Sequence, residues 1–277
     1  MTTMPRTTPP DATITPTLED YLLAIDSLQS EHQDVIGARM AERLEVTPAS
    51  VSQTVDRMVK QGLIVVSDDH HIGLTDEGRA AADSICRRHR LTERFLADVL
   101  ELDWAQAHTE AHRLEHAMSD LVQERLSKFM DHPETCPHGA PIPGNFPDGG
   151  DAGWRLLADT SAGERLVIRR ISEMVEGDPE LLRYCSDKNL RPGVLVTVRE
   201  IGPDRVFILD VDGDPVAVSS RLSAHVFCEA AAALAAARRA VRARQPPSVP
   251  ADSQEVSPCP APHPDRPRRS PATTAAR

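Results

Sequence analysis

The distribution of proline most constrains how this 277-residue chain can fold, because proline lacks a backbone N–H and interrupts helices and central strands. Its 23 prolines concentrate before Asp20, between His132 and Asp151, and after Gln245. Little apolar material is present there to offset the entropy lost on ordering. We therefore expect a disordered N-terminal tail, an internal linker and a disordered C-terminal tail, with folded structure between them.

The chain shows neither a membrane segment nor a secretion signal. No stretch approaches the roughly 20 apolar residues of a spanning helix, and the N-terminus lacks the basic-then-apolar pattern of an export signal. The five cysteines are odd in number and never form a C-x-x-C pair, which argues against a disulfide framework and a zinc ribbon. We expect a cytoplasmic protein with reduced thiols and no membrane partner.

The first folded segment begins with helical patterns. An apolar stripe over Thr17–His32 predicts a helix, and T-L-E-D at Thr17–Asp20 is typical of a capping box. A shorter stripe covers Ile36–Leu44. Thr47 followed by Pro48 then marks the start of a third helix.

The third helix and the two short apolar runs after it complete a recognisable order of elements. Gly62 is placed to end the helix, and Leu63–Val66 and Ile72–Leu74 read as two strands of a hairpin. Helix, helix, tight turn, helix and hairpin is the order of a winged helix-turn-helix. The predicted core face of the third helix consists of Val51, Val55, Met58 and Val59.

Two long helical patterns come next, over Asp76–Leu100 and Trp104–Phe129, with Asp103 and Gln106 as a capping box between them. The second pattern carries more apolar residues along one side than a single short domain needs, so we expect it to form a dimer contact. An ordinary intramolecular helix pair is the alternative.

Beyond the linker, four short runs rich in β-branched residues predict a small β-barrel with an inserted helical turn at Asp178–Cys185. An Ala-rich run, Glu229–Arg244, predicts a helix. The expected fold class is mainly α with a small amount of β: a winged helix-turn-helix, a helical dimerisation domain and a C-terminal SH3-like β-barrel. The expected boundaries are a tail at 1–16, a DNA-binding domain at 17–75, a helical metal-binding and dimerisation domain at 76–132, a Pro-rich linker at 133–155, the SH3-like domain at 156–230, and the helix with a basic tail at 231–277.

A stripe of histidine and glutamate on the second long helix carries the strongest chemical signal. His108, His112, Glu115 and His116 stand at offsets that place all four within about 100° of arc on a helix. A second pair, His89 and Glu93, lies one turn apart on the preceding helix. Together they predict two metal sites with mixed nitrogen and oxygen ligands. Such ligands suit borderline and hard divalent ions, whereas structural zinc sites use thiolates.

Two other interpretations of this stripe stay open. The residues can be an ordinary solvated helix face, or the ligands of a metal-dependent hydrolase. The spacing is not H-E-x-x-H, and no general base stands outside the ligand set, which disfavours the hydrolase.

The third helix of the first segment carries a second functional signal. If Val51, Val55 and Met58 face the core, the side chains that face outward are typical of major-groove contacts. We expect DNA contacts from Ser50, Ser52, Gln53, Arg57 and Lys60.

The charge balance argues against unassisted DNA binding. Residues 34–62 are neutral overall, and the chain carries −11. The tail from Arg238 onward holds eight Arg against three acidic residues, a net +5, so the rest carries −16. An acidic body binds polyanions poorly, so binding of double-stranded DNA would need something that offsets the carboxylates. A metal-independent regulator, which is the alternative kind of DNA-binding protein, would have no such need.

At this point the residues resemble the diphtheria-toxin-repressor and manganese-transport-regulator family of metal-dependent repressors. The similarity runs from about Thr17 to Gly144, and the later strands resemble the SH3-like third domain of longer members only from Leu166 to about Phe227. The carrying motifs are S-V-S-Q-T-V-D-R-M at Ser50–Met58, R-R-H-R-L-T-E-R-F-L at Arg87–Leu96, H-T-E-A-H-R-L-E-H-A-M-S-D at His108–Asp120 and C-P-H-G-A-P-I-P-G at Cys136–Gly144.

The resemblance implies a homodimer that represses metal-uptake genes from operator DNA, with two ions per subunit. The implied primary ligands are Asp20, His112, Glu115 and His116, and the implied ancillary ligands are His89, Glu93 and His108, completed by Asp178 or Glu180. Two positions depart from the family. His112 stands where iron-responsive members have Cys and manganese-responsive ones have Glu, and Leu23 replaces a carboxylate of some manganese members.

The regulating ion is expected to be Mn(II), with Fe(II) as the alternative. Asp20 supplies a carboxylate where iron-responsive relatives have Met, and no Cys enters the site, whereas the extra imidazole of His112 favours Fe(II). The linker pair Cys136 and His138 admits two interpretations, a metal site or packing of the Pro-rich linker on the chain's own SH3-like domain, and we favour packing.

Overall fold

The computed structural model describes residues 14–232. Most of the predicted tails at 1–16 and 231–277, and most of the predicted Ala-rich helix, lie outside these residues. The start of that helix was wrong: Glu229 and Ala230 belong to the last strand of the sheet. Val226, Phe227 and Cys228 are all buried, and pairing with β4 continues through Glu229 and Ala230, so it is sheet pairing rather than a local period that extends the strand into the Ala-rich run.

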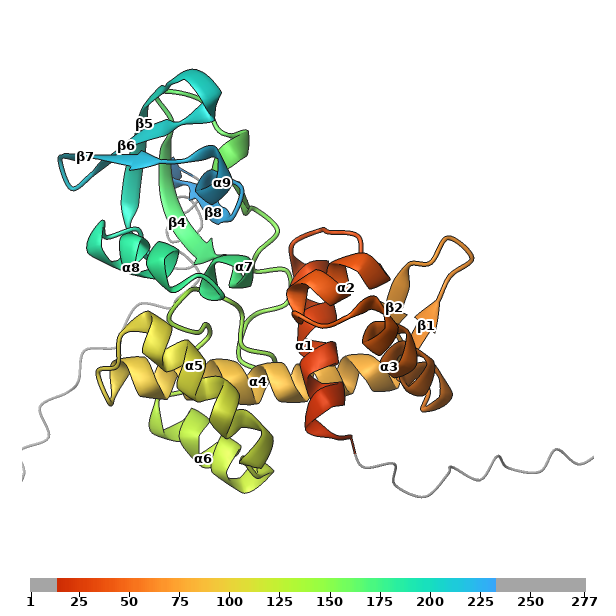
Figure 1. Ribbon diagram of the computed structural model, residues 1–277. Coiled ribbons are helices and arrows are strands. Elements are labelled where there is room, and N and C mark those ends of the chain that lie inside the picture. Colours follow the sequence, from red (N-terminus) through yellow and green to blue (C-terminus); the bar gives the residue numbers. More distant parts are fainter. Residues whose placement is uncertain (1–13, 233–277) are drawn as a thin grey trace, which may run out of the picture. The chain divides into compact units, whose positions relative to one another are not determined.

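Figure 1 shows three groups of elements along the described chain. We call the first the reading head; it comprises α1 (Pro16–Ser30), α2 (Gly37–Arg43), α3 (Pro48–Lys60), β1 (Ile64–Val66) and β2 (Ile72–Leu74). The second, the helical domain, comprises α4 (Asp76–Asp98), α5 (Trp104–Leu114), the 3₁₀ helix η1 (Glu115–Ala117) and α6 (Asp120–Phe129).

The third group, the sheet domain, follows the linker. It comprises β3 (Arg155–Leu156), η2 (Leu157–Asp159), β4 (Arg165–Ile171), α7 (Glu173–Glu176), α8 (Pro179–Asp187), β5 (Leu195–Ile201), η3 (Pro203–Arg205), β6 (Phe207–Val211), β7 (Asp214–Val218), α9 (Ser220–Ser223) and β8 (Val226–Ala230).

The reading head has the predicted winged helix-turn-helix order. Thr47 caps α3 by accepting a hydrogen bond from the Ser50 N–H at 3.2 Å, and Gly62 takes a φ of +75° just after the helix. The predicted capping box at Thr17 was wrong. The helix begins at Pro16 after Thr15, whose side chain makes no capping hydrogen bond, because proline at the first turn already fixes the helical φ.

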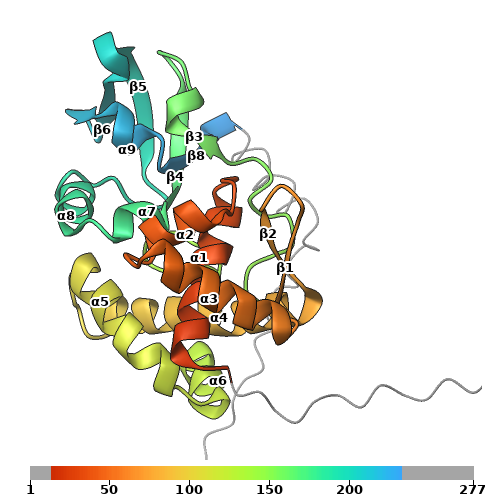
Figure 2. The same ribbon diagram turned by 45° about the vertical axis from the view of Figure 1, so that its right-hand side comes forward.

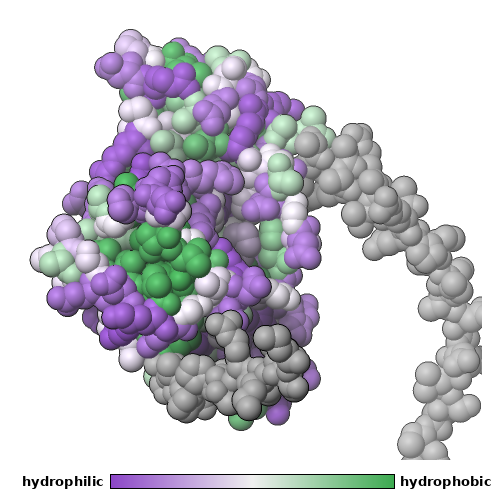
Figure 3. All heavy atoms as spheres, turned by 90° about the vertical axis from the view of Figure 1, so that its right-hand side faces the viewer, coloured by the Kyte–Doolittle hydropathy of each residue, from purple (hydrophilic) through white to green (hydrophobic). Residues whose placement is uncertain are grey.

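One apolar core holds the reading head together. The core side of α3 is narrower than predicted: Val51 and Met58 are buried and Val55 is partly buried, whereas Val59 is 44% exposed. Val59 therefore belongs to the surface. Figure 3 looks at the side of the molecule that carries the reading head and shows a mostly hydrophilic surface with one apolar patch.

The helical domain differs from the prediction of one long helix over residues 104–129. That helix is broken after η1, because Met118 is extended and Ser119 caps α6 by accepting a hydrogen bond from Val122 N–H. The Asp103 and Gln106 capping box at the start of α5 is confirmed. Large apolar side chains remain exposed on η1's flanks and α6, as expected for a dimer contact; these are Leu114, Leu121, Val122 and Phe129.

The sheet domain is a six-stranded antiparallel sheet in the order β3-β8-β4-β5-β6-β7. A tight turn at Asp212 and Gly213 joins β6 to β7. Strand β3 and helix α7 are elements that the sequence pattern did not predict, since each spans only two to four residues. A continuous core fills the domain, with Leu166, Ile168, Val198 and Phe207 fully buried.

Side-chain contacts join the three groups. Arg90 of α4, only 6% exposed at its side chain, bonds Asp26 of α1 at 3.1 Å and Glu173 of α7 at 2.7 Å. Arg170 of β4 donates to the Ser30 carbonyl at 3.2 Å. No helix within residues 14–232 is long and apolar enough to cross a membrane.

Candidate metal centre

Packing of α5 against α4 places the predicted ligands face to face. Ala107 and Ala111 on α5 are completely buried beside Leu96 of α4, and their small side chains allow the two helices to approach closely. His89 and Glu93 on α4 therefore meet His108 and His112 on α5. Figure 2 shows the reading head turned toward the viewer with α5 and α6 beside α4.

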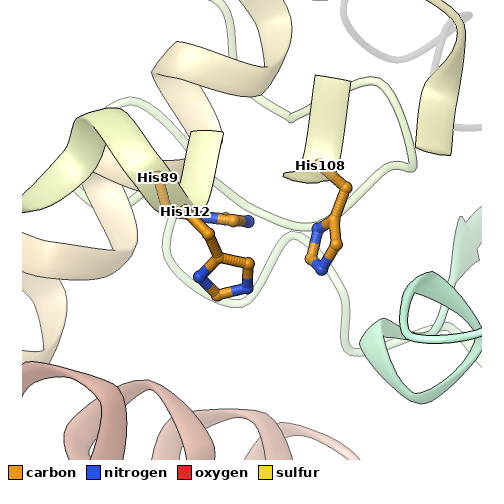
Figure 4. Close-up of side chains that lie close together, drawn as sticks. All are labelled: His89, His108 and His112. Carbon is orange, nitrogen blue, oxygen red and sulfur yellow. The ribbon is translucent and has the colours of Figure 1, made fainter. Parts of the chain in front are cut away.

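Three histidines form the first group of candidate ligands. His89, His108 and His112 each offer a ring nitrogen, and these nitrogens lie within 4.8 Å of one another. Figure 4 shows the three rings gathered around a common space. The ring centroid of His112 lies 4.7 Å from those of both His89 and His108. Three imidazoles at this separation can hold a borderline divalent ion.

A second group joins the reading head to the helical domain. His116 Nε2 lies 3.2 Å from Asp20 Oδ1 and 3.5 Å from Glu115 Oε1. Asp20 belongs to α1, whereas Glu115 and His116 belong to η1. The break after η1 does not disturb the predicted stripe, because it falls beyond His116.

His112 lies between the two groups. Its Nδ1 is 3.2 Å from Glu115 Oε1, while its ring contacts the other two histidines of the first group. The resemblance assigned it to the ion held by Asp20, and the structure brings it within reach of either position. Glu115 also reaches His89, with Oε2 2.5 Å from Nδ1, so the two predicted sites share one continuous network.

A third group centres on Glu93 and includes residues that sequence reasoning assigned to packing. Glu93, Cys136 and His138 are almost completely buried, and their candidate ligand atoms lie within 4.8 Å of one another. Glu93 Oε2 lies 3.7 Å from His138 Nδ1, and its Oε1 lies 2.8 Å from His108 Nδ1. The C-x-H spacing left a metal site and linker packing open, and both interpretations stay predictions: Glu93 lies beside His138, and the His138 carbonyl accepts from the Ile171 N–H of the sheet domain.

The predicted ligands from the sheet domain are not brought to any of these groups. Asp178 caps α8 by accepting from the Glu180 and Leu181 N–H groups, and its other oxygen lies 3.4 Å from Arg221. Glu180 is exposed. In this arrangement Asp178 serves the N-terminus of α8, and neither it nor Glu180 is brought to the ancillary ligands, so their assignment stays a prediction that the structure does not support.

The electrostatics of the network favour the ionised forms of Glu93 and Glu115. Burial opposes ionisation of Glu115, but hydrogen bonds with His112 and His89 outweigh it and lower the pKa of Glu115 to about 2. Burial likewise disfavours the charged form of His89, yet Glu93 and Glu115 raise the pKa of His89 well above its usual value. The positive charge favoured on His89 is the kind of charge that a divalent cation would supply at this position.

Glu19 is a functional candidate that sequence reasoning missed. Its Oε2 lies 2.7 Å from His116 Nδ1 and its Oε1 lies 3.2 Å from Arg88. A carboxylate on the second ring nitrogen orients a metal-binding imidazole and leaves Nε2 free to coordinate. Glu19 is adjacent to Asp20 in the sequence, but its burial against η1 depends on the tertiary fold.

The predicted DNA contacts lie together on the outer side of α3. Ser50, Ser52, Gln53, Arg57 and Lys60 are all exposed. Ser50 also contributes to the helix cap, with its Oγ 3.0 Å from Thr47 Oγ1. The remaining side chains offer an amide and two cations along one helix face, which suits base edges and phosphates.

A winged helix-turn-helix joined through histidine and carboxylate ligands to a helical domain defines a class of protein: a DNA-binding regulator that responds to a divalent metal. Models of the iron dependent repressor N-terminal DNA binding domain and its metal binding and dimerisation domain match residues 13–72 and 75–144. A FeoA domain model matches residues 155–230.

Known proteins agree with these matches. The chain is 42% identical over 191 residues to the iron-dependent repressor IdeR of Mycobacterium tuberculosis, covering 66% of this chain and 83% of the relative. It is 38% identical over 189 residues to the diphtheria toxin repressor of Corynebacterium diphtheriae, covering 66% and 84%. A solved manganese-dependent transcriptional repressor in complex with manganese superposes with a TM-score of 0.69 at 31% identity, covering 76% and 99%.

The chain belongs to the diphtheria toxin repressor family of metal-dependent transcriptional repressors, whose members bind operator DNA as dimers and take divalent metals as regulatory ions. Its relatives are DNA-binding repressors, which decides against the hydrolase that the stripe alone left open. Both iron-named and manganese-named proteins are among them.

Proposed function

We propose that this protein is a cytoplasmic, Mn(II)-responsive repressor of metal-uptake genes that binds its operator as a homodimer. The observation that carries the proposal is the position of Asp20, whose carboxylate lies beside Glu115 and His116 although it belongs to the reading head. A shared ion at this point would join the reading head to the helical domain.

The donor set fits a divalent cation in two places, so we propose two ions per subunit. Asp20, Glu115 and His116, with His112, would hold one; His89, Glu93 and His108 would hold the other. A bound ion supplies positive charge that compensates the clustered carboxylates. Glu19 would keep His116 oriented for this role through its Nδ1 contact.

Tethering α1 determines where α3 points, since both helices pack in one core. The Asp20 side chain is 44% exposed, and its partial burial raises the pKa of the carboxyl. Its contact with His116 is therefore the link between the reading head and the helical domain that ion binding would adjust. A reading head held at one angle in each subunit would present two copies of Gln53 and Arg57 at the spacing of an operator's half-sites.

The choice of Mn(II) rests on ligand hardness. Asp20, Glu93 and Glu115 supply oxygen ligands, and no thiolate belongs to the two proposed positions. A second candidate is an Fe(II)-responsive repressor, which the three-imidazole group of His89, His108 and His112 favours.

Gel-shift titration with and without chelator tests the function. We expect specific duplex binding only with a divalent ion, and anaerobic titration with Mn(II), Fe(II), Co(II) and Zn(II) ranks the ions. Asp20→Met should lose mainly the Mn(II) response. Equal DNA affinity with and without chelator would contradict a metal-dependent mechanism, and a response to Fe(II) alone would favour the second candidate.

We also propose that the sheet domain binds the chain's own Pro-rich linker. The Ile171 N–H of β4 donates to the His138 carbonyl at 2.8 Å, and a Cβ added at Gly139 would lie 2.0 Å from the Arg169 carbonyl oxygen. Gly139→Ala should release the linker, and faster proteolysis between residues 133 and 155 would measure it. Gly163→Ala, where an added Cβ meets open space, controls for backbone strain at positive φ.

A further inference from the structure

A cavity lies outside the three groups of candidate metal ligands. It has a volume of about 400 Å³ and is formed by the end of α4, the start of α5, the linker and the sheet domain. We call it the tryptophan cavity, because the chain has two tryptophans and both line it. Its cationic and aromatic lining consists of Arg94, Trp104, Phe146, Trp154, Arg169 and Arg191.

Two of the three arginines of this cavity lie over aromatic rings. The Cζ atoms of Arg169 and Arg191 each lie 5.4 Å from a tryptophan ring centroid, Trp154 and Trp104 respectively. A guanidinium that stacks on an indole keeps its edge directed outward for a hydrogen-bonding partner. A planar ligand with an acidic group can therefore contact a ring and a guanidinium together.

Two carboxylates, Asp98 and Glu134, also line the cavity, so its three arginines are only partly neutralised. Arg94 pairs with Asp98 at 2.9 Å, and Arg169 lies 3.6 Å from Glu229. Arg191 donates instead to the uncharged oxygens of Ser186, and within residues 14–232 no carboxylate lies at ion-pair distance from it. Its charge is available for an anion.

Trp154 is held in place by a second aromatic ring of the lining. Its ring lies edge to face on Phe146 with the centroids 5.8 Å apart. Its indole Nε1 is buried and has no hydrogen-bond partner within the described part of the chain, so it is the ring face, not the N–H, that can contact a bound molecule.

The tryptophan cavity adjoins the third ligand group. Trp104 packs edge to face on His138 with the ring centroids 4.8 Å apart, and Arg94 lies with Nη1 3.4 Å from the Cys136 carbonyl oxygen. A molecule that contacts Trp104 and Arg94 would therefore act on residues next to Cys136 and His138. Coupling between two such sites is reciprocal.

We propose that the tryptophan cavity binds a small aromatic acid, either a carboxylate or a phosphate ester, and that its occupancy is coupled to divalent-ion binding by the helical domain. The guanidinium of Arg191 takes the acidic group, and the indoles of Trp104 and Trp154 take the planar body. The volume accommodates a molecule of metabolite size.

Intrinsic tryptophan fluorescence of the full chain tests this directly, because both emitting residues line the cavity. The probes are benzoate and phenyl phosphate. Cyclohexanecarboxylate is the control that lacks a planar ring, and inorganic phosphate is the control that lacks a ring altogether. We expect saturable changes for the aromatic acids with dissociation constants on the order of 1 mM, and affinities lower by about tenfold in Arg191→Gln. Arg183→Gln, an exposed arginine of α8 that does not line the cavity, is the matched control.

Repeating each titration with saturating Mn(II) measures the coupling. The proposal expects the benzoate affinity to change in the unmodified chain and to change less in Trp104→Phe. Absence of saturation by both aromatic acids, or equal binding in Arg191→Gln, would overturn the site. Equal affinity for inorganic phosphate would overturn the role of the rings, and equal affinity with and without Mn(II) would overturn the coupling. The titrations without Mn(II) are independent of the repressor proposal. The coupling arm rests on the proposed Mn(II) binding, so direct Mn(II) titration of the same preparation separates absent coupling from absent metal binding.

Discussion

Helices α1 and α3 of the reading head share one apolar core but differ in what their polar sides contact. The outer side of α3 carries exposed hydroxyl, amide and basic groups, among them Ser52, Gln53 and Arg57. The polar side of α1 is directed into the rest of the molecule: Asp20 meets His116 of η1, and Asp26 meets Arg90 of α4.

In the proposed mechanism, α3 carries the residues that recognise DNA, whereas α1 carries the residues that control how α3 is presented to it. Residues 34–62 are electrically neutral, so α3 has little general attraction for a polyanion and depends on being presented at the correct angle. In the proposed mechanism, the contacts of α1 with η1 and α4 determine this angle. Substitutions on α1's partners should therefore change DNA binding or stability more than substitutions on α3 itself.

The largest expected effect is on the metal network. Glu115→Gln removes the charge that links His89, His112 and η1, and we expect DNA affinity with Mn(II) to fall roughly a thousandfold, toward the non-specific level. Gel shift and metal titration on the same preparation measure it. Glu110→Gln changes an exposed glutamate of α5 and should leave binding unchanged; an equal loss in both variants would argue that α5 has unfolded.

The next largest effect is on the buried arginine between the domains. Arg90→Met leaves Asp26 and Glu173 without their common partner, and we expect unfolding in urea to show a loss of about 3–5 kcal/mol. Arg79 also contacts Asp26, but its side chain is 42% exposed, so Arg79→Met should cost only about 1 kcal/mol or less. Similar losses in the two variants would contradict the importance of burial.

The same cluster gives a pH dependence with a definite sign. Burial opposes ionisation of Asp26, but Arg90, the Cys86 thiol and Arg79 together lower the pKa of Asp26 below its ordinary value of 3.8. A lowered folded-state pKa stabilises the fold above pH 4 and loses that contribution as the pH falls through the folded value. Asp26→Asn should therefore be less stable than the unmodified chain at neutral pH, and the difference should narrow below pH 4.

The contrast between α1 and α3 also explains what the sequence could predict. Thr47, Pro48 and Gly62 set the limits of α3 by local chemistry, and the exposed face followed from Val51 and Met58. The His108 to His116 stripe predicted that these side chains share one face, and the structure brings them together even though α5 ends before η1; their role as ligands stays a prediction. Glu19 and Arg90 could not be recognised, because their roles depend on which charged groups the tertiary fold buries beside them.

A smaller, sequence-specific effect is expected at the recognition surface. Gln53→Ala removes an exposed amide able to bond a base edge, and should cost roughly 1–3 kcal/mol in operator binding and relax the preference at one base pair. Binding to a panel of operators, each with one substituted base pair, measures this. A loss that is equal for all operators would instead place Gln53 on the phosphate backbone.

The smallest effect is expected for Lys60, at the C-terminal end of α3. An exposed lysine that neutralises one phosphate contributes through counterion release, so Lys60→Ala should weaken binding to all sequences alike and reduce the slope of log affinity against log salt by about one. Lys128 of α6 lies in the helical domain, and Lys128→Ala should leave the slope unchanged. Because the metal network is untouched, the Mn(II) concentration at half-maximal binding should stay the same in Lys60→Ala. If that concentration shifts instead, α3 and the metal network are more directly connected than the separate contacts of α1 and α3 imply.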